Sequence, residues 1–445
     1  MRILTLGLFA AVLLHAQSGG RAYATGEAWW NAGFGGVLPW DENYDNPDGQ
    51  VTITNRTGAI HTQGHAFFEP LGTNGRACVT CHQPASAMGL SAATIKQRWI
   101  DSNGKDPVFA AFDGSNCPSL PQQLFSSHSL TIERGLFRIP LPWPPKNVAH
   151  PEFTIEVVRD PAGCNLSPVY GLKSANPTVS VYRRPRVVAN LNTLLTGPGG
   201  GTAPVFMADG REPSLEAQAT NAALGHEQSH RVPTADQLRQ IVEFEKQIFA
   251  SQNSDIRAGL LHNGSALGVD NLARGNASSL AVIAVSFDPW RKLPDNMPAV
   301  QREFRESIVR GSDLFFARSF PVHGVAGAES ATCATCHSSG TTRWMNIGTT
   351  SESQSQSLPL FKVTCLATGS VVYTEDPGRG LISGKCEDVG AIVVQQFRGL
   401  SARAPYFANG SAKDLESVVE FYNQRFGIGF TERERKDLAN FLRAL

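Results

Sequence analysis

The sequence predicts a mainly α-helical protein of two domains, with loop-rich and short-strand insertions. A Cys-x-x-Cys-His motif occurs once in each half of the chain, at residues 78–82 and 333–337. Amphipathic segments with capping residues surround these motifs, and this pattern is typical of helices. The length of 445 residues is enough for two or three domains.

The N-terminus has the pattern of a secretory signal peptide, which we place at residues 1–24. Arg2 supplies a positive charge, the apolar run Ile3–Leu14 follows, and Ala22-Tyr23-Ala24 offers a cleavage site. We therefore expect the protein to be periplasmic or secreted. No apolar run is long enough to predict a stable membrane span.

The first domain is predicted to cover residues 25–295. Its beginning is rich in Gly, Asn and Thr, which predicts loops and short strands. A helix is expected to start after Ser91. An inserted segment follows at about residues 100–180, and it is proline-rich with strand-like runs at Phe153–Val158 and just beyond it at Val179–Tyr182.

A further helix is predicted after Thr234, because apolar residues recur there at helical spacing. These residues are Leu238, Ile241, Val242, Ile248 and Phe249. The polar stretch 251–297 then contains many Asn, Gly and Ser residues. We therefore place the domain boundary near residue 296.

The second domain, residues 296–445, is predicted to contain three helices. The first carries Phe304, Ile308 and Leu314 and leads into the second cysteine motif. The next starts after the polar run 411–414, and the last starts at the capping box Thr431–Glu434. Apart from the cysteine motif, the sequence shows no repeat between the two halves.

Charge and cysteine usage limit the function. Lysine plus arginine and aspartate plus glutamate number 39 each, so the net charge of zero disfavours a nucleic-acid partner. Four of the eight cysteines lie outside the motifs, and in an exported protein they favour two disulfides. Of the three pairings, we expect the one that keeps a bridge in each half, Cys117–Cys164 and Cys365–Cys386.

Both cysteine motifs predict covalent attachment of a c-type haem. Two cysteines three positions apart lie about one helical turn apart, so both thiols can reach the vinyl groups of one haem. The next histidine can bind the iron. A zinc site would need two more paired ligands, and a redox-active cysteine pair would not need the histidine. The predicted attachment and ligand residues are Cys78, Cys81, His82, Cys333, Cys336 and His337.

Further segments resemble a known family. They are Tyr182–Asn190, Asp209–Ala219, Ala404–Gly410 and Val418–Tyr422 with the helix that follows at Thr431–Leu445. Together with the haem motifs, they resemble the bacterial diheme cytochrome c peroxidase and MauG superfamily over most of residues 60–445. The segments around the first motif and at 100–180 resemble a less characterised branch, distantly similar to the rubber oxygenases.

The resemblance implies a mostly helical cytochrome c fold around each haem. It implies that the N-terminal haem, ligated by His82, is the peroxidatic one, and that the C-terminal haem, ligated by His337, transfers electrons. It also implies a small redox protein, either a cytochrome c or a cupredoxin, as electron donor. Calcium is a further cofactor to consider.

The sixth ligand of the second haem has two candidates. Counting from Pro405, Tyr422 falls where the peroxidases have an axial methionine and MauG has an axial tyrosine. Tyr422 shares an apolar helix face with Leu415 and Val418, and a phenolate is an accepted haem ligand. A tyrosine that only packs in the core is the competing interpretation, and Met345 is the alternative ligand.

Peroxide cleavage requires an open iron site and a group that moves a proton. By resemblance, Gln218 matches the family's signature glutamine. The family's catalytic glutamate lies one position farther from this glutamine than Glu227 does, so both His226 and Glu227 are candidates. A solvated His-Glu pair is the competing interpretation. The earlier histidines His61 and His65 are weaker candidates for ligands of the first iron in a resting state.

Three features depart from the family. Its inter-haem tryptophan is Ala208 here, and Trp344 is one candidate to replace it. The histidine of its Pro-Tyr-Phe-His-Asp-Gly segment is Ala408. The inserted segment 100–180 can shape a pocket larger than peroxide needs.

Three functions compete. The leading one is an exported diheme enzyme that reduces hydrogen peroxide at the N-terminal haem with electrons passed through the C-terminal haem. The second is a MauG-like or oxygenase-like enzyme that oxidises an organic or protein substrate. The third is a diheme electron-transfer cytochrome without catalysis, which is disfavoured because such carriers rarely need so long a chain per haem.

Overall fold

The computed structural model describes residues 21–24, 27–192, 205–262, 268–274, 286–322, 329–337, 344–345 and 355–445. Nearly all of the predicted signal peptide therefore lies outside the described residues. None of the described helices is both long and apolar enough to cross a membrane.

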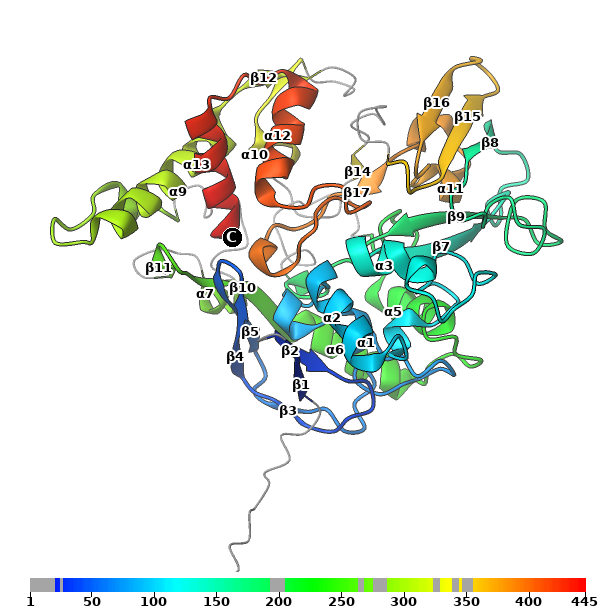
Figure 1. The fold of residues 1–445 in the computed structure, drawn as a ribbon, viewed down its shortest axis with the longest axis horizontal. Helices are drawn as coiled ribbons and strands as arrows, with labels where there is room; N and C mark the ends of the chain where they lie inside the picture. Colours follow the sequence, from blue (N-terminus) through cyan, green and yellow to red (C-terminus); the bar gives the residue numbers. More distant parts are fainter. Residues whose placement is uncertain are drawn as a thin grey trace, which may run out of the picture.

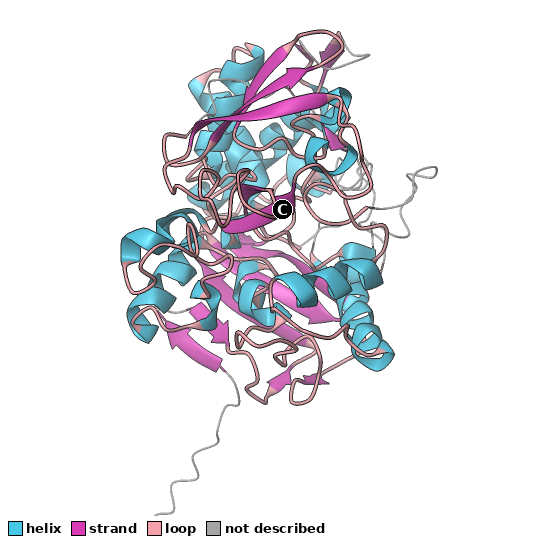
Figure 2. Cartoon of the chain, turned by 90° about the vertical axis from the view of Figure 1, so that its right-hand side faces the viewer, coloured by secondary structure: helices cyan, strands magenta, loops and turns pink. Residues whose placement is uncertain are grey.

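The fold is a mixture of helices and small sheets, so the prediction of a mainly α-helical protein is wrong. Helix accounts for 34% and strand for 20% of the structure. Figure 2 shows strands near both ends of the molecule, with helices around them. The strand-like runs predicted at Phe153–Val158 and Val179–Tyr182 are confirmed as parts of β8 (Phe153–Arg159) and β9 (Thr178–Arg183). The sheets themselves escaped prediction because the paired strands are remote in sequence: β5 (Gly49–Asn55) pairs with β10 (Ile248–Asp255), and β8 pairs with β15 (Leu360–Cys365).

The N-terminal part is built on a four-stranded antiparallel sheet with the order β11-β10-β5-β4. The helices that pack near it surround the first cysteine motif (Figure 1). The remaining strands and helices of this part are β1 (Arg21–Ala24), β2 (Glu27–Trp30), β3 (Val37–Leu38), β4 (Asp41–Asn46), β6 (Ile60–His61), β11 (Gly259–Leu260), α1 (Cys78–Cys81), α2 (Ala92–Ser102), α3 (Ser129–Arg134), α5 (Leu215–Gly225), α6 (Ala235–Gln247) and α7 (Val269–Ala273).

Two predicted helices of this part are confirmed at their first residue. The Ser91 hydroxyl accepts a hydrogen bond from the Thr94 backbone and caps α2. Thr234 opens α6 through a capping box. The prediction that Ile248 and Phe249 continue this helix is wrong, because both belong to β10, where they are buried against β5.

The C-terminal part contains the predicted helices α9 (Ala299–Ala317), α12 (Leu415–Phe426) and α13 (Glu432–Arg443), together with the short α10 (Cys333–Cys336). α9 packs closely against α13 because Gly311 has no side chain. A Cβ atom at this position would lie 2.0 Å from the Asp437 carbonyl oxygen. The strands β12 (Phe320–Pro321) and β13 (Ser330–Ala331) pair beside these helices.

The inserted segment pairs with the C-terminal half of the chain. Its strand β8 forms a three-stranded sheet with β15 and β16 (Val371–Thr374), at the upper right of Figure 1. A second pair joins β7 (Phe137–Pro142) to β9 (Thr178–Arg183). The other elements of this region are β14 (Trp344–Met345), β17 (Ile392–Val393) and α11 (Gly380–Ser383). The short 3₁₀ helices of the chain are Pro84–Ser86, Pro107–Phe109, Phe125–His128, Asp288–Arg291, Cys386–Asp388 and Leu400–Ala402.

Both predicted disulfides are confirmed, with Cα–Cα distances of 5.4 Å for Cys117–Cys164 and 5.9 Å for Cys365–Cys386. Each bridge lies within one half of the chain. Such bridges are typical of proteins from an oxidising compartment.

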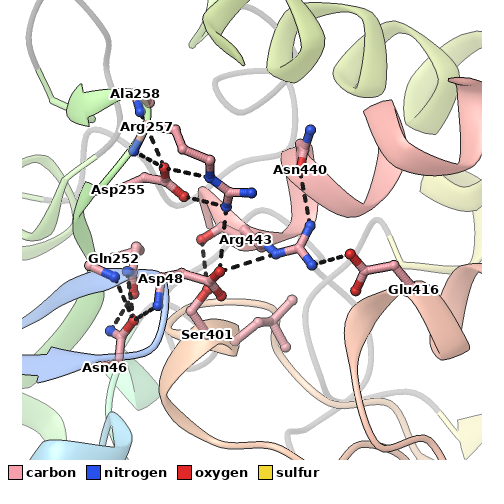
Figure 3. Close-up of polar contacts among 12 residues, drawn as sticks. Asn46, Asp48, Gln252, Asp255, Arg257, Ala258, Ser401, Glu416, Asn440 and Arg443 are labelled. Carbon is pink, nitrogen blue, oxygen red and sulfur yellow. Dashed lines mark hydrogen bonds and ion pairs between the residues drawn. The ribbon is translucent and has the colours of Figure 1, made fainter. Parts of the chain in front are cut away.

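The two halves are also joined by charged side chains (Figure 3). Arg443 of α13 forms ion pairs with Asp48, at 3.3 Å, and with Glu416. Asp48 lies in the turn between β4 and β5, and Arg257 contacts it from the end of β10 at 3.4 Å. This network holds the last helix against the N-terminal sheet.

Candidate functional site

The first cysteine motif lies at the wall of a cavity of about 170 Å³. Cys78 and Cys81 are the ends of the single turn α1, and both are free thiols. His82 follows at the C-terminal cap. All three side chains line the cavity, so the spacing predicted from the sequence brings two thiols and an imidazole to one wall.

His82 is oriented by the backbone and kept neutral by burial. Its Nδ1 lies 3.3 Å from the Met88 carbonyl oxygen, which fixes the ring when Nδ1 carries the proton. Desolvation lowers the pKa of His82 to about 4. A neutral imidazole with one nitrogen free is the form that binds a metal.

The second motif lies at the wall of a larger cavity, of about 390 Å³. Cys333, Cys336 and His337 line it, and burial lowers the pKa of His337 to about 4. The Nδ1 atom of His337 is buried and has no hydrogen-bond partner among the described residues. The two histidines therefore differ in their support, since only His82 is held by a carbonyl group.

Each of these sites fits a covalently attached haem. Two thiols separated by one helical turn can form both thioether bonds, and the neutral imidazole beside them can bind the iron. The thiols face cavities with walls that are otherwise largely apolar, as a porphyrin ring requires. When bound, the haem would be attached through Cys78 and Cys81 in the first cavity and through the second pair, 333 and 336, in the other.

The structure shows a repeat between the two halves that the sequence did not reveal. A turn at Phe206–Glu212 precedes α5, and a turn of the same kind at Tyr406–Ala412 precedes α12. In both turns, the first and last residues form an isolated antiparallel bridge. The second residue of each turn, Met207 or Phe407, has φ of 66°. The fifth residue is in both turns a glycine, with φ of 64° in the first and 61° in the second.

The helices after these turns correspond position by position. Ser214 caps α5 and Asp414 caps α12, each with its side chain accepting a hydrogen bond from the backbone three residues later. Corresponding residues of the two turns are 200 positions apart in the sequence, and so are the two capping residues. Residues of α5 therefore correspond to residues of α12 with this offset.

The helices α6 and α13 are a second equivalent pair in the two halves. Thr234 and Thr431 open α6 and α13 with capping boxes. Ten residues later, Phe244 packs on Phe67 with ring centroids 4.4 Å apart, and Phe441 packs on Phe315 at 5.4 Å. Phe67 and Phe315 each lie 6.4 Å from the motif histidine of their own half. The two cavities therefore share one framework.

The repeat makes the two cavities directly comparable. Where the first cavity has Gln218 and Ala222, the second has Val418 and Tyr422, and all four residues line their cavities. The residue after the packed phenylalanine is Glu245 in the first cavity and Leu442 in the second. At three corresponding positions, the first cavity is thus more polar or more open than the second.

Tyr422 is placed beside His337. Its ring is perpendicular to the imidazole, with an interplanar angle of 88° and centroids 6.3 Å apart. Burial raises the pKa of its phenol, and the neighbouring Cys333 and Cys336 raise it further. Met345, the alternative ligand, pairs through its backbone with Ile392, but its side chain lies outside the described part of the structure.

The predicted catalytic residues come together at the first cavity. The Gln218 Oε1 atom is buried there, and no described residue gives it a hydrogen bond. His226 ends α5 and places its Nδ1 2.6 Å from the buried carboxylate of Asp113, which also pairs with Arg76. Although burial alone would raise it, the pKa of Asp113 is held below its usual value by Arg76 and His226.

Glu227 is buried at the same cavity, with 3% of its surface exposed. Its Oε2 accepts a hydrogen bond from the Leu71 backbone at 2.9 Å, and its Oε1 lies 3.5 Å from the Cys78 sulfur. Desolvation raises the pKa of Glu227 to about 7. The competing interpretation of a solvated side chain does not describe this position of Glu227.

Sequence reasoning missed Glu245 of α6. It is 2% exposed, lines the first cavity, and has an Oε2 atom without a hydrogen-bond partner among the described residues. Burial, with a smaller contribution from Glu216, raises its pKa to about 8. The only sequence signal was a charged residue on the apolar face of a helix, between Ile241 and Ile248.

A thin wall separates the two cavities. Its residues line both of them, and they are Arg184, Pro185, Arg186, Val187, Ala208, Gln395 and Gln396. Ala208 is fixed in this wall by its carbonyl oxygen, which accepts a hydrogen bond from the Val393 backbone at 2.8 Å. Trp344 pairs with the same Val393 through the backbone, so β14 and β17 run beside the wall. Ala408 lines only the second cavity.

The remaining candidate ligands lie elsewhere. His61 is exposed in β6, and the ring of His65 packs between Phe68 and Phe244 instead of lining the first cavity. Among the described residues, no cluster of three His, Cys, Asp or Glu side chains could hold a metal ion. Calcium therefore stays a prediction of the sequence.

The comparisons with known proteins add little. No protein-family model and no curated protein matches the chain. The chain is similar to the crystal structure of a MauG-like protein associated with microbial copper homeostasis, with 14% identity and a TM-score of 0.32 over 60% of this chain and 74% of that one. A TM-score this low does not assign a shared fold, so the two cavities themselves define what the protein can do.

Proposed function

We propose that this protein is an exported diheme c-type oxidoreductase that reduces hydrogen peroxide at the first haem with electrons passed through the second. One observation carries this proposal: the corresponding positions 222 and 422 hold Ala in the first cavity and Tyr in the second. A small side chain leaves room for a substrate beside the iron, whereas a tyrosine can fill the sixth position. The two haem sites would therefore be one catalytic and one electron-transferring.

The residues of the first cavity suit proton transfer. Reduction of peroxide to two water molecules consumes two electrons and two protons, and a haem bound at Cys78 and Cys81 would supply the iron that passes the electrons on. The amide oxygen of Gln218, to which no described group donates, can accept a hydrogen bond from a peroxide O–H group. Glu227, buried and with a pKa near neutral, can hold a proton and release it.

The second cavity suits electron transfer. Its walls around the motif are aromatic, with Phe315, Phe397 and Tyr422 near His337. A strong sixth ligand keeps an iron from reacting with small molecules while it still exchanges electrons. A small redox protein, a cytochrome c or a cupredoxin, would be the donor, and the shared wall would lie on the path to the first cavity.

A second candidate is a MauG-like or oxygenase-like enzyme that oxidises an organic or protein substrate. The larger cavity favours it, because Tyr182 of β9, Tyr373 of β16 and the adjacent Glu375 extend its lining beyond the haem motif. A diheme electron-transfer cytochrome without catalysis is the third candidate. The Gln218 oxygen, which has no partner in the described part of the chain, and the buried carboxyls of the first cavity argue against it.

The experiment that decides among these is spectroscopy of the ferric holoprotein combined with a peroxide assay. We expect one high-spin and one low-spin haem, and reduction of hydrogen peroxide with a reduced cytochrome c as donor. Two low-spin haems without turnover would leave only the electron-transfer cytochrome. A high-spin haem without peroxide reduction by any donor would favour oxidation of an organic substrate.

A further inference from the structure

Three arginines meet where the two cavities adjoin. Arg184 and Arg186 line both cavities, and Arg403 lines the second. Arg184 and Arg403 are 8% and 9% exposed. They come from two remote parts of the chain, the segment after β9 and the segment before the Tyr406 turn, so the fold has gathered their charges in one place.

The hydrogen bonds of these arginines go to backbone carbonyls and amides. Arg184 donates to the carbonyl oxygens of Leu90, Arg134 at 2.7 Å and Arg403 at 2.9 Å. Arg186 donates to the two carbonyl oxygens of residues 393 and 394 at 2.7 and 2.8 Å. A guanidinium has five N–H donors, so each side chain retains unused ones. The Nε atom of Arg403 is buried without any partner among the described residues.

No described carboxylate lies within ion-pairing distance of the three arginines. The nearest acids already have partners, because Asp209 pairs with Arg183 and Arg211 at 2.5 and 2.7 Å, and Asp376 pairs with Arg183 at 2.6 Å. Desolvation lowers the pKa of Arg184 to about 9 and that of Arg186 to about 10, and repulsion from Arg403 contributes to both. Buried cations without anions are costly to a fold.

We propose that Arg184, Arg186 and Arg403 form one anion site that binds carboxylate groups of both haems. This inference rests on the proposed presence of two haems and deepens it. A haem held through its vinyl groups at a cysteine motif has its two carboxylates on the opposite edge of the ring. The unused N–H groups match the geometry that arginine offers to carboxylates. The site would thus anchor both haem rings, and its positive charges would influence the reduction potentials of both irons.

The connection has a measurable consequence. A cation beside a haem carboxylate stabilises the reduced iron relative to the ferric iron, which carries one more positive charge. Removing Arg186 should therefore lower the reduction potentials of both haems, because it lines both cavities. Removing Arg403 should lower the potential of the second haem more than that of the first.

The test is spectroelectrochemical titration of the holoprotein and of the variants Arg186→Gln, Arg186→Lys and Arg403→Gln. The control is Arg138→Gln, since Arg138 is also buried and bonded to a carbonyl group but lines neither cavity. Haem content by mass verifies that both cofactors are present. We expect both potentials to fall in Arg186→Gln, to recover largely in Arg186→Lys, and to stay near the wild-type values in the control.

Two outcomes would overturn the proposal. One is a pair of potentials that moves no more in Arg186→Gln and Arg403→Gln than in the control. The other is a dependence of the wild-type potentials on phosphate at constant ionic strength, because the anion would then come from solution. Neither outcome depends on peroxide turnover, so the anion site and the proposed peroxidase activity fail separately.

Discussion

At corresponding positions of a shared framework, the first cavity has Gln218, Ala222 and Glu245, whereas the second has Val418, Tyr422 and Leu442. The two turns, the two caps and the two packed phenylalanines are the same in both halves. Within this framework, three pairs of corresponding side chains that face the cavities differ in polarity or size. In the proposed function, these differences leave the first haem site open to a small substrate and to proton transfer, whereas Tyr422 fills the sixth position of the second iron.

The largest effect is expected from removing one attachment site at a time. Cys78→Ala with Cys81→Ala should remove the first haem and leave the second, and the corresponding pair at 333 and 336 should do the reverse. Mass spectrometry of the purified protein counts the haems. Peroxide reduction should be lost in both variants, but only the first should lose the high-spin signal. Retention of two haems in either variant would refute the assignment.

The next largest effect is expected when a large side chain replaces Ala222 in the first cavity. Ala222→Tyr should place a ring where the second cavity has Tyr422, and we expect peroxide reduction to fall by about 100-fold or more as the substrate position closes. The added ring should also cost about 1–3 kcal/mol of stability. Ala222→Val is the control that adds volume without a ligand atom. An unchanged turnover in Ala222→Tyr would show that position 222 does not face the substrate.

The converse change removes the phenol oxygen of Tyr422 from the second cavity. Tyr422→Phe should leave the fold nearly intact, because the ring still packs between Phe407 and Phe426. The second iron should lose its sixth ligand or gain water or Met345, and its potential should rise because an anionic ligand that favours ferric iron is gone. Ferric spectra of the variant check this. Low-spin features identical to those of the wild type would make Tyr422 a core residue.

Replacing Glu227, a buried acid of the first cavity, should have a smaller but clear effect on peroxide reduction. Glu227→Gln keeps an oxygen for the Leu71 backbone but cannot transfer a proton, so peroxide reduction should fall on the order of 100-fold. Glu216→Gln, at an exposed position in the first turn of α5, is the control. Stopped-flow mixing with peroxide measures the rate. A full rate in Glu227→Gln would move the role to His226 or to Glu245.

The smallest effect concerns stability and pH. The pKa of Glu245 is raised from 4.5 to about 8, so between these values the folded protein holds a proton that the unfolded chain has released. The free energy of unfolding of the wild type should therefore fall as pH rises through this window. Glu245→Gln does not titrate and should gain stability relative to the wild type from pH 5 to pH 8.5. Denaturant unfolding at both values checks this, and a constant difference would contradict it.

The sequence by itself determined the local features of this protein. Both cysteine motifs and the caps at Ser91, Thr234 and Thr431 follow from short-range patterns of residue type, and the structure confirms the capped helices. The two disulfide pairs are predicted by a different argument, that each half of the chain keeps its own bridge, and the structure confirms them. The motifs and caps could be predicted because neighbouring residues alone establish them. The fold class could not, since β5 and β8 find their partners about 200 residues away.

Only the tertiary structure decided which residues share a cavity. Glu245 has the sequence pattern of an ordinary charged helix residue, and only the packing of α6 buries it at the cavity that Gln218 also lines. The correspondence of α5 with α12 rests on backbone turns and caps. The two turns share only Ala208 with Ala408 and Gly210 with Gly410, which is too little identity to reveal the repeat from the sequence. The arginines at the shared wall became a candidate site only when two remote segments met, because tertiary packing determines whether a charge is buried and which groups surround it.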